Sequence, residues 1–134
     1  MSTVRIMIVD DNPAFSWAAK SFLNTNPNLR VVASVTSAAE GLELLDQVKP
    51  DLVLMDVVMD RMSGLEATRL IKQEENAPKV VVLTMHNAAE YRASADAAGA
   101  DGFITKDNLV AELPPLIESL FPGETKESGR KNDS

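Results

Sequence analysis

The chain has 134 residues, 45% of them hydrophobic, and this length and composition predict one globular domain with a buried core. A formal net charge of −7 argues against sequence-independent binding to nucleic acid, which needs clustered lysine and arginine. There is no cysteine, which excludes disulfides and thiolate metal sites, and no apolar run approaches the ~20 residues that span a bilayer, so we expect a cytoplasmic protein without membrane association.

Short apolar runs rich in valine, isoleucine and leucine alternate with helix-like stretches along the chain. Several runs are continuously apolar, as expected of parallel strands that are covered on both faces. The predicted strands are Val4–Val9, Arg30–Val35, Leu52–Met55, Lys79–Leu83 and Gly102–Ile104.

Helix start and stop signals lie between these runs. Asn12 followed by Pro13 is typical of a capped first turn, and Gly99 stands where a helix that ends near Ala98 would take a left-handed cap. Capping-box spacing occurs twice, in Ser37 with Glu40 and in Asn87 with Glu90. The predicted helices are Pro13–Leu23, Ala38–Val48, Gly64–Gln73, Ala88–Ala98 and one in the final segment.

This alternation predicts an α/β fold with five βα units, right-handed crossovers and a doubly wound parallel sheet. The last helix is irregular, because Pro114 and Pro115 would remove hydrogen bonds from a helix interior. We therefore expect a turn or short helical piece around residues 108–112 and a helix that restarts at the prolines and ends near Leu120. Residues 122–134 are polar and carry no net charge, and we expect them to be a disordered tail after a domain of residues 1–121.

Polar side chains follow the predicted strands at the edge of the sheet where ligands bind in this architecture. They are Asp10 and Asp11 after the first strand, Asp56 after the third, Thr84 after the fourth and Lys106 after the fifth. Each alone is more often a turn, capping or solvated surface residue. Together, three carboxylates repel one another unless a cation lies among them, and Mg²⁺ accepts such oxygen ligands along with water and phosphate.

This constellation resembles the receiver domain of two-component response regulators, across roughly residues 3–121. The loop "DVVMDRMSGLEATRLIK" is also similar to the one that follows the phosphoacceptor in that family, with Met59 and Gly64 in register. The resemblance implies the flavodoxin-like strand order 2-1-3-4-5. It also implies a phosphoryl-accepting switch that alters a protein-interaction surface, and that is no enzyme beyond its own phosphorylation and slow dephosphorylation.

The resemblance implies a role for each residue. Asp56 would accept the phosphoryl group from a phosphohistidine, Lys106 would pair with a phosphoryl oxygen, and Thr84 would donate a hydrogen bond to another. Thr84 would then move toward the phosphoryl group and Phe103, at the aromatic switch position, would turn inward, although a core aromatic residue would also fit there. Asp11, Asp56 and the backbone carbonyl of Val58 would hold Mg²⁺, and Asp10 would bind it directly or through a metal-bound water.

The chain departs from the family pattern at several positions. Asp107 follows Lys106 where most members carry proline, and it can cap the segment that follows. Asp60 also replaces a usual proline. Val58 and His86 occupy variable positions that modulate phosphoryl lifetime in this family, and an apolar Val58 cannot orient an attacking water, so we expect a long-lived phosphoryl form.

The implied upstream partner is a sensor histidine kinase or a histidine phosphotransfer protein, and the implied downstream partner is a protein. The two adjacent prolines fall on the face that changes in this family, so we expect a monomer or a weak phosphorylation-dependent dimer. No helix-turn-helix pattern follows residue 121, which favours a stand-alone receiver without direct nucleic-acid binding. The sequence is nonetheless similar to receivers that precede helix-turn-helix output domains, so a truncated DNA-binding regulator is the alternative.

Two other classes fit less well. A phosphohydrolase with an aspartate nucleophile would have a second acid two residues after it, whereas Val58 stands two residues after Asp56. A flavin- or dinucleotide-binding domain would have a glycine- or hydroxyl-rich loop after the first strand, whereas "DDNPAF" is acidic and would repel phosphate without a metal.

Overall fold

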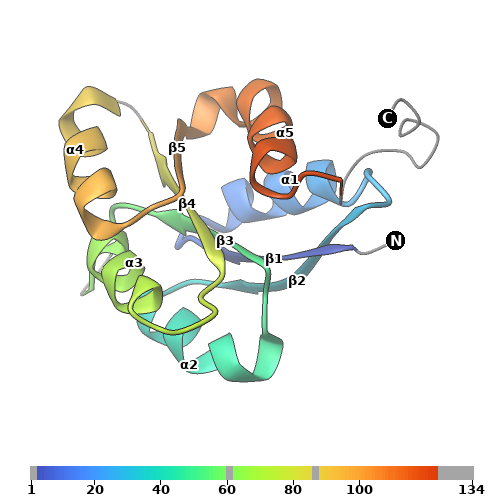
Figure 1. The fold of residues 1–134 in the computed structure, drawn as a ribbon. Helices are drawn as coiled ribbons and strands as arrows, with labels where there is room; N and C mark the ends of the chain where they lie inside the picture. The colour runs from blue at the N-terminus through green and yellow to red at the C-terminus, as the bar shows by residue number, and fades with distance from the viewer. Residues whose placement is uncertain (1–2, 60–61, 86–87, 124–134) are drawn as a thin grey trace.

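The computed structural model describes residues 3–59, 62–85 and 88–123, and within them five parallel strands alternate with five α-helices (Figure 1). The strands pair in the order β2-β1-β3-β4-β5, which confirms the predicted flavodoxin-like sheet. The strands are β1 (Val4–Val9), β2 (Leu29–Val35), β3 (Leu52–Asp56), β4 (Lys79–Thr84) and β5 (Gly102–Thr105). The helices are α1 (Pro13–Leu23), α2 (Ala38–Val48), α3 (Gly64–Lys72), α4 (Ala88–Ala98) and α5 (Leu109–Leu120), with a short 3-10 helix, η1 (Lys106–Asn108), before α5.

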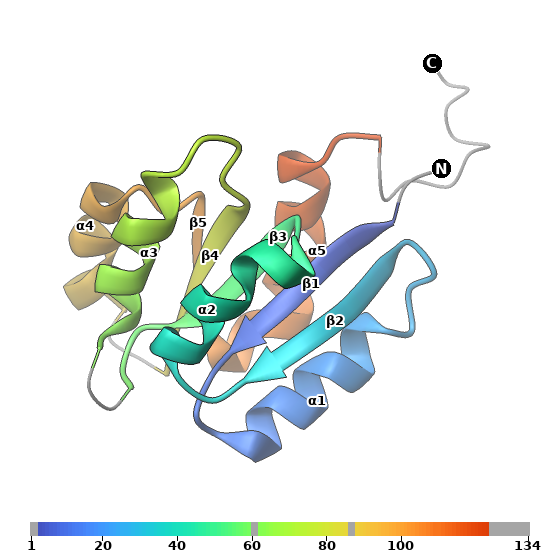
Figure 2. The same ribbon diagram turned by 90° about the horizontal axis from the view of Figure 1, so that it is seen from below.

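The helices cover both faces of the sheet, which explains why the central strands β1, β3 and β4 are mostly apolar and buried. Helices α1 and α5 pack on one face, and α2, α3 and α4 pack on the other (Figures 1 and 2). Successive residues of β4 alternate between the two cores: Val81 joins the α1/α5 side and Val80 and Val82 the opposite side. No helix in the described ranges has both the length and the apolar character needed to cross a membrane.

The caps at the ends of the helices largely match those predicted from the sequence. The Asn12 side chain accepts hydrogen bonds at the start of α1, and Ser37 Oγ accepts one from the Glu40 N–H at 3.1 Å at the start of α2. Gly99 has φ +91°, and the Ala100 N–H donates to the Ala95 carbonyl at 3.1 Å, so the predicted left-handed cap of α4 is confirmed. The other predicted capping box lies outside the described residues, because Asn87 is not among them.

The last helix is continuous, so the predicted break before Pro114 is wrong. Helix α5 runs from Leu109 to Leu120 with both prolines inside it. Its buried side chains are Leu109, Leu113 and Ile117, which are spaced by four residues and lie in the core beside the sheet. Burying each contributes ~1.5–3 kcal/mol, which together offsets the ~3 kcal/mol that each proline costs. Tertiary packing therefore overrides the local signal.

Asp107 does not cap the segment that follows it, which corrects the second expectation for this region. Asp107 lies inside η1, whose N-cap is Thr105, and the N-cap of α5 is Asn108. Neither cap residue accepts a capping hydrogen bond through its side chain. Instead the Asn108 side chain donates to Thr105 Oγ1 at 2.9 Å, so the turn after β5 is fixed by a bond between these two side chains.

Candidate functional site

Strand register brings the predicted polar residues to one edge of the sheet. Val9 of β1 lies opposite Met55 of β3, so Asp10 and Asp56, one residue further along, are neighbours. Thr84 is the last residue of β4 and lies opposite Thr105 of β5, which places Lys106 directly beyond that pair. Parallel strands in register thus deliver residues from four distant parts of the sequence to one place.

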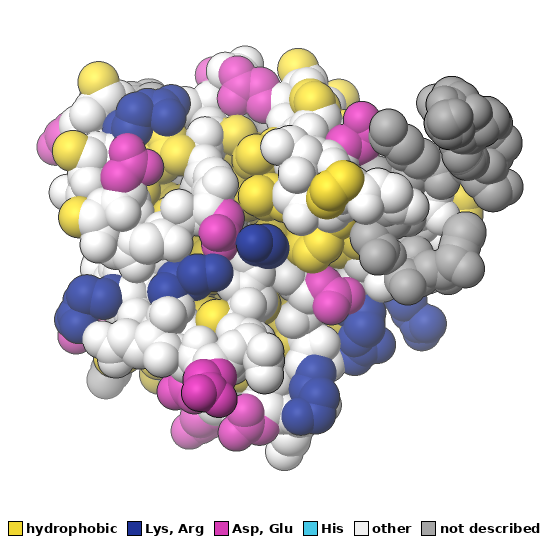
Figure 3. Space-filling view, in the orientation of Figure 1, with side chains coloured by type: hydrophobic (Ala, Val, Ile, Leu, Met, Phe, Trp, Pro, Cys, Tyr) yellow, Lys and Arg dark blue, Asp and Glu magenta, His cyan; other side chains and the backbone are white. Residues whose placement is uncertain are grey.

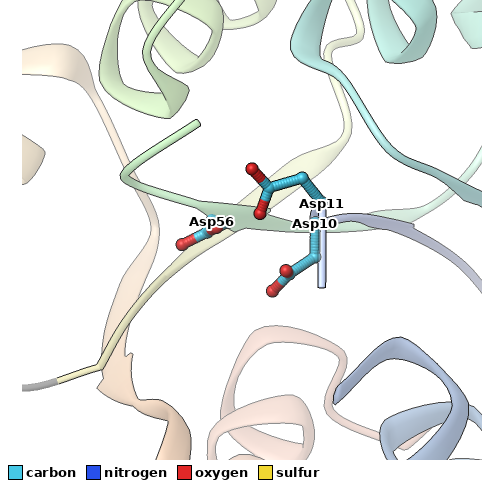
Figure 4. Close-up of side chains that lie close together, drawn as sticks. All are labelled: Asp10, Asp11 and Asp56. Atoms are coloured by element: carbon cyan, nitrogen blue, oxygen red, sulfur yellow. The ribbon is translucent and has the colours of Figure 1, made fainter. Parts of the chain in front are cut away.

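Three carboxylates lie together at this edge (Figure 4). Asp10, Asp11 and Asp56 each offer an oxygen, and these oxygens all lie within 4.8 Å of one another. Asp10 and Asp56 are buried, with exposed fractions of 0% and 5%, whereas Asp11 is exposed. The cluster thus combines two buried acids with one acid that solvent can reach.

The Lys106 ammonium lies among these acids. Its Nζ is 2.6 Å from Asp10 Oδ2 and 3.6 Å from Asp56 Oδ1, and its side chain is only 7% exposed. One ammonium faces three carboxylates, so the described part of the site carries an excess of negative charge. A bound cation would reduce this excess.

The electrostatics of Asp56 reflect that excess. Burial first, and then repulsion from Asp10, raise the pKa of Asp56 from its ordinary value of 3.8 to about 6. The Lys106 ammonium and a hydrogen bond from the backbone of Val58 oppose the rise in this pKa, and the charge of Asp11 adds to it. The carboxylate is thus costly to ionise in the absence of a cation.

The residues present fit a hard divalent cation such as Mg²⁺. Asp10 Oδ1 accepts a hydrogen bond from the Asn12 N–H at 2.8 Å. Asp10 Oδ2 is buried and is paired with the Lys106 ammonium at 2.6 Å. Three neighbouring carboxylates offer the all-oxygen donor set that Mg²⁺ prefers, and the exposure of Asp11 leaves room for the water ligands of the ion.

A cavity of about 470 Å³ opens above Asp56. Of the predicted site residues, Asp11, Asp56, Val58, Thr84 and Lys106 line it, and Asp10 lies buried beneath, paired with Lys106. Val58 is 63% exposed at its surface. The remaining lining residues, which were not predicted to be part of the site, are Asn12, Met85 and Tyr91.

The missed residues carry no signal that could be separated from their ordinary structural roles. Tyr91 reaches the cavity from α4, a helix whose rotation relative to the sheet cannot be read from its own sequence. Met85 simply follows Thr84 and is 61% exposed. Asn12 was predicted as a helix cap, which it is, and its position next to Asp11 also brings it to the cavity.

Phe103 does not line the cavity. It is half-buried on β5 and packs against the core on the α2, α3 and α4 side. The Arg92 guanidinium of α4 lies 4.9 Å from the centre of its ring. The aromatic ring at the predicted switch position is therefore held from outside by a cation.

Gly64 lets the loop after β3 fold back onto the strand. The Gly64 N–H donates to the Val57 carbonyl at 3.0 Å, and a Cβ at Gly64 would lie 1.8 Å from the Asp56 carbonyl oxygen. Only glycine allows this approach, because any side chain would collide with the backbone of the central aspartate. The glycine that matches the family loop is thus required by the backbone geometry at Asp56.

The sequence is similar to response regulators over most of its length. The family model described as "Response regulator receiver domain" matches residues 6–118. The transcriptional regulatory protein MctR of Rhizobium johnstonii is 34% identical over 122 residues, which is 91% of this chain and 57% of MctR. LiaR of Bacillus subtilis, also a transcriptional regulatory protein, is 32% identical over 123 residues, or 92% of this chain and 58% of LiaR. The chain thus spans less than two thirds of either relative.

Solved structures show the same likeness. A LuxR-family two-component response regulator from Aurantimonas superposes with a TM-score of 0.83 at 36% identity, covering 95% of this chain and 91% of that one. The signal receiver domain of a NarL response regulator from Mycobacterium tuberculosis superposes with a TM-score of 0.83 at 26% identity, covering 92% and 99%.

Proposed function

The chain belongs to the response regulator receiver family, and from that premise we propose that it is a phosphoryl-accepting signalling switch with Asp56 as the acceptor. The observation that carries the proposal is the position of Asp56, which lies at a cavity of about 470 Å³ with the Lys106 ammonium 3.6 Å from its Oδ1. The donor is a phosphohistidine of a sensor histidine kinase or a histidine phosphotransfer protein. We further propose that residues 1–121 form the receiver and residues 122–134 a tail.

The transfer itself requires one bond to form and one to break. A carboxylate oxygen of Asp56 attacks the phosphorus, the bond between phosphorus and the histidine nitrogen breaks, and its electron pair stays on the imidazole. The product is an aspartyl phosphate. The raised pKa of Asp56 makes its carboxylate costly to ionise, and the neighbouring ammonium favours the ionised form that the attack requires.

The residues around Asp56 position the reactants and compensate charge. Lys106 pairs with one phosphoryl oxygen, and the Thr84 hydroxyl donates to another. Asp10, Asp11, Asp56 and the Val58 carbonyl would hold Mg²⁺, which when bound supplies charge compensation for the phosphoryl group. Little covalent work falls to the protein beyond this arrangement.

Phosphorylation then changes the protein surface. We propose that Thr84 moves toward the phosphoryl group and that Phe103 turns inward, altering the face formed by α4, β5 and α5. Figure 3 shows hydrophobic side chains gathered over α5 on this side of the molecule, and Val110 of α5 is 63% exposed. Such a surface supports output through contact with another protein.

A second candidate is favoured by the comparisons: the chain is the receiver part of a DNA-binding regulator. MctR and LiaR are both transcriptional regulatory proteins, and the match covers only 57% and 58% of them. In this case the switch would act on an output domain. In both candidates the chemistry at Asp56 is the same.

Mass spectrometry after incubation with acetyl phosphate and Mg²⁺ tests the proposal. The wild type should gain one phosphoryl group, and the gain should require Mg²⁺ and be absent in Asp56→Asn. Asp96→Asn is the matched control, because Asp96 is an exposed aspartate of α4, and it should label like the wild type. Absence of any gain in the wild type, or an equal gain in Asp56→Asn, would reject Asp56 as the acceptor.

A further inference from the structure

The ring of Phe15 lies beside the Lys106 ammonium. Lys106 Nζ is 4.6 Å from the ring centroid, well inside the ~6 Å range over which an aromatic face attracts a cation. Phe15 belongs to the first turn of α1 and is half-buried against the core shared by α1 and α5. Packing therefore holds the Phe15 ring in place beside the Lys106 ammonium, which is almost fully buried.

One carboxylate places both partners of this contact. Asp10 Oδ2 is 2.6 Å from Lys106 Nζ, and Asp10 Oδ1 accepts from the Asn12 N–H at 2.8 Å. Asn12 Oδ1 in turn accepts from the Phe15 N–H at 3.2 Å, as well as from the N–H of Ala14 at 3.0 Å. The start of α1, and with it the ring, is thus tied to the same acid that holds the ammonium.

An aromatic face suits this position better than a further polar group. The site already has three carboxylates around one ammonium, so another anion would add to the repulsion that a metal must offset. A ring attracts the cation through its quadrupole without adding net charge. It also imposes no hydrogen-bond direction, so the ammonium can move from Asp10 toward a phosphoryl oxygen on Asp56 while staying in contact with the ring.

We propose that Phe15 is a positioning residue for Lys106, which guides the ammonium between Asp10 and the phosphoryl group on Asp56. This proposal rests on the function proposed above. It assigns Phe15 no contact with the phosphoryl group, and it predicts an effect on phosphoryl binding that is separate from any effect on Mg²⁺ binding.

The decisive variants are Phe15→Leu, which keeps an apolar side chain without the aromatic face, and Phe15→Tyr, which keeps the face. Phe22→Leu is the matched control, because Phe22 lies on the same helix and packs half-buried against the same core. The measurements are Mg²⁺ affinity, and the affinity for beryllofluoride, a phosphoryl mimic, at saturating Mg²⁺.

Phe15→Leu should weaken beryllofluoride binding by about 3- to 10-fold, the range expected for a desolvated cation–aromatic contact. Its Mg²⁺ affinity should stay within about two-fold of the wild type, since the ring contacts no carboxylate in this scheme. Phe15→Tyr should restore beryllofluoride affinity, and in a Lys106→Met background Phe15→Leu should have no further effect. An unchanged affinity in Phe15→Leu, an equal loss in Phe22→Leu, or a loss that persists without Lys106 would overturn the proposal.

Proton NMR separates this proposal from the function on which it rests. The ε-methylene protons of Lys106 should be shifted upfield by the ring in the wild type and in Phe15→Tyr, and should return toward ordinary values in Phe15→Leu. Absence of the upfield shift would reject the contact even if Asp56 is phosphorylated. A wild type that shows the shift but binds no beryllofluoride would reject the phosphoryl function, and the positioning role with it.

Discussion

The Lys106 ammonium lies nearer to Asp10 than to Asp56, at 2.6 Å from Asp10 Oδ2 and 3.6 Å from Asp56 Oδ1. Both partners of the closer pair are buried, with side-chain exposures of 7% and 0%. The only ammonium among the described cavity-lining residues is therefore engaged by an acid that, in the function we propose, does not accept the phosphoryl group.

Removing this ammonium should cost stability. In Lys106→Met, buried Asp10 loses its partner, and the free energy of unfolding without Mg²⁺ should fall by about 3 kcal/mol. Added Mg²⁺ should recover part of the loss, because a cation again faces Asp10. Urea unfolding with EDTA or with Mg²⁺ measures both effects. Lys20→Met, at an exposed position of α1, should change stability by less than about 0.5 kcal/mol.

The raised pKa of Asp56 predicts how stability depends on pH without Mg²⁺. The folded protein holds this proton up to about pH 6, whereas an ordinary aspartate with a pKa of 3.8 releases it earlier. The contribution of protonated Asp56 to the free energy of unfolding is therefore fully present below about pH 4 and is lost as the pH rises through about 6. The free energy of unfolding changes by up to about 3 kcal/mol across this range.

Asp56→Asn isolates this effect. The variant should unfold at higher urea than the wild type at pH 7 in EDTA, and the two should converge near pH 4, where the acid is protonated. Saturating Mg²⁺ should remove the advantage of the variant at pH 7. If the wild type were more stable than Asp56→Asn at pH 7 in EDTA, the raised pKa of Asp56 would be contradicted.

A methyl group at Gly64 should disturb the Asp56 backbone. Gly64→Ala places a Cβ 1.8 Å from the Asp56 carbonyl oxygen, so the loop after β3 must move, and we expect a loss of about 3 kcal/mol or more. Phosphoryl labelling should fall with it. Gly41→Ala is the milder comparison, because its Cβ would meet side chains rather than backbone, Val9 at 3.0 Å and Val35 at 3.6 Å, and we expect a loss of about 1 kcal/mol. Equal losses in the two variants would show that the Asp56 backbone is not the cause.

Replacing a proline in α5 should stabilise the protein. Pro115 is exposed inside a continuous helix, so Pro115→Ala restores a helical N–H without opening a cavity. Against the gain of up to ~3 kcal/mol stands the greater freedom of the unfolded chain, which costs ~0.4–1 kcal/mol, so a net gain of about 2 kcal/mol is expected. Thermal and urea unfolding measure it. Pro27→Ala, in the exposed turn before β2, is the control and should give no such gain. If Pro115→Ala also gave no gain, a helix that is continuous through the prolines would be contradicted.

The side chain at position 58 should set the lifetime of the phosphoryl group. Val58 is 63% exposed at the cavity and cannot orient a water molecule through its side chain. The labelled wild type should therefore persist for minutes or longer, and Val58→Asn should shorten its lifetime. Following the decay of the labelled mass after removal of the donor measures both. A wild-type half-life of seconds would contradict this role of Val58.

The sequence predicted the sheet and the residues at its edge because both depend on short-range patterns. The valine-rich run of β4 has to be buried on both faces, and parallel register then carries the residue that follows each strand to the same edge. The roles of Asp56 and Lys106 came from a family resemblance and remain predictions.

What escaped prediction depends on tertiary packing. The continuity of α5 through Pro114 is decided by the burial of Leu113 and Ile117 against the sheet, which outweighs the local preference. The access of Tyr91 to the cavity, and the cation that Arg92 places over Phe103, depend on how α4 is rotated. The rotation of α4 cannot be predicted from any short stretch of the sequence.

Each of the two carboxylate oxygens of Asp10 makes a different structural contact. One oxygen fixes Asn12 at the start of α1, and the other faces Lys106. Glutamate would reach one methylene further and would displace both contacts at once, and asparagine would present a neutral group to the ammonium. In a saturation library, position 10 should therefore tolerate fewer replacements than the exposed Asp11 next to it, even among clones selected only for folding.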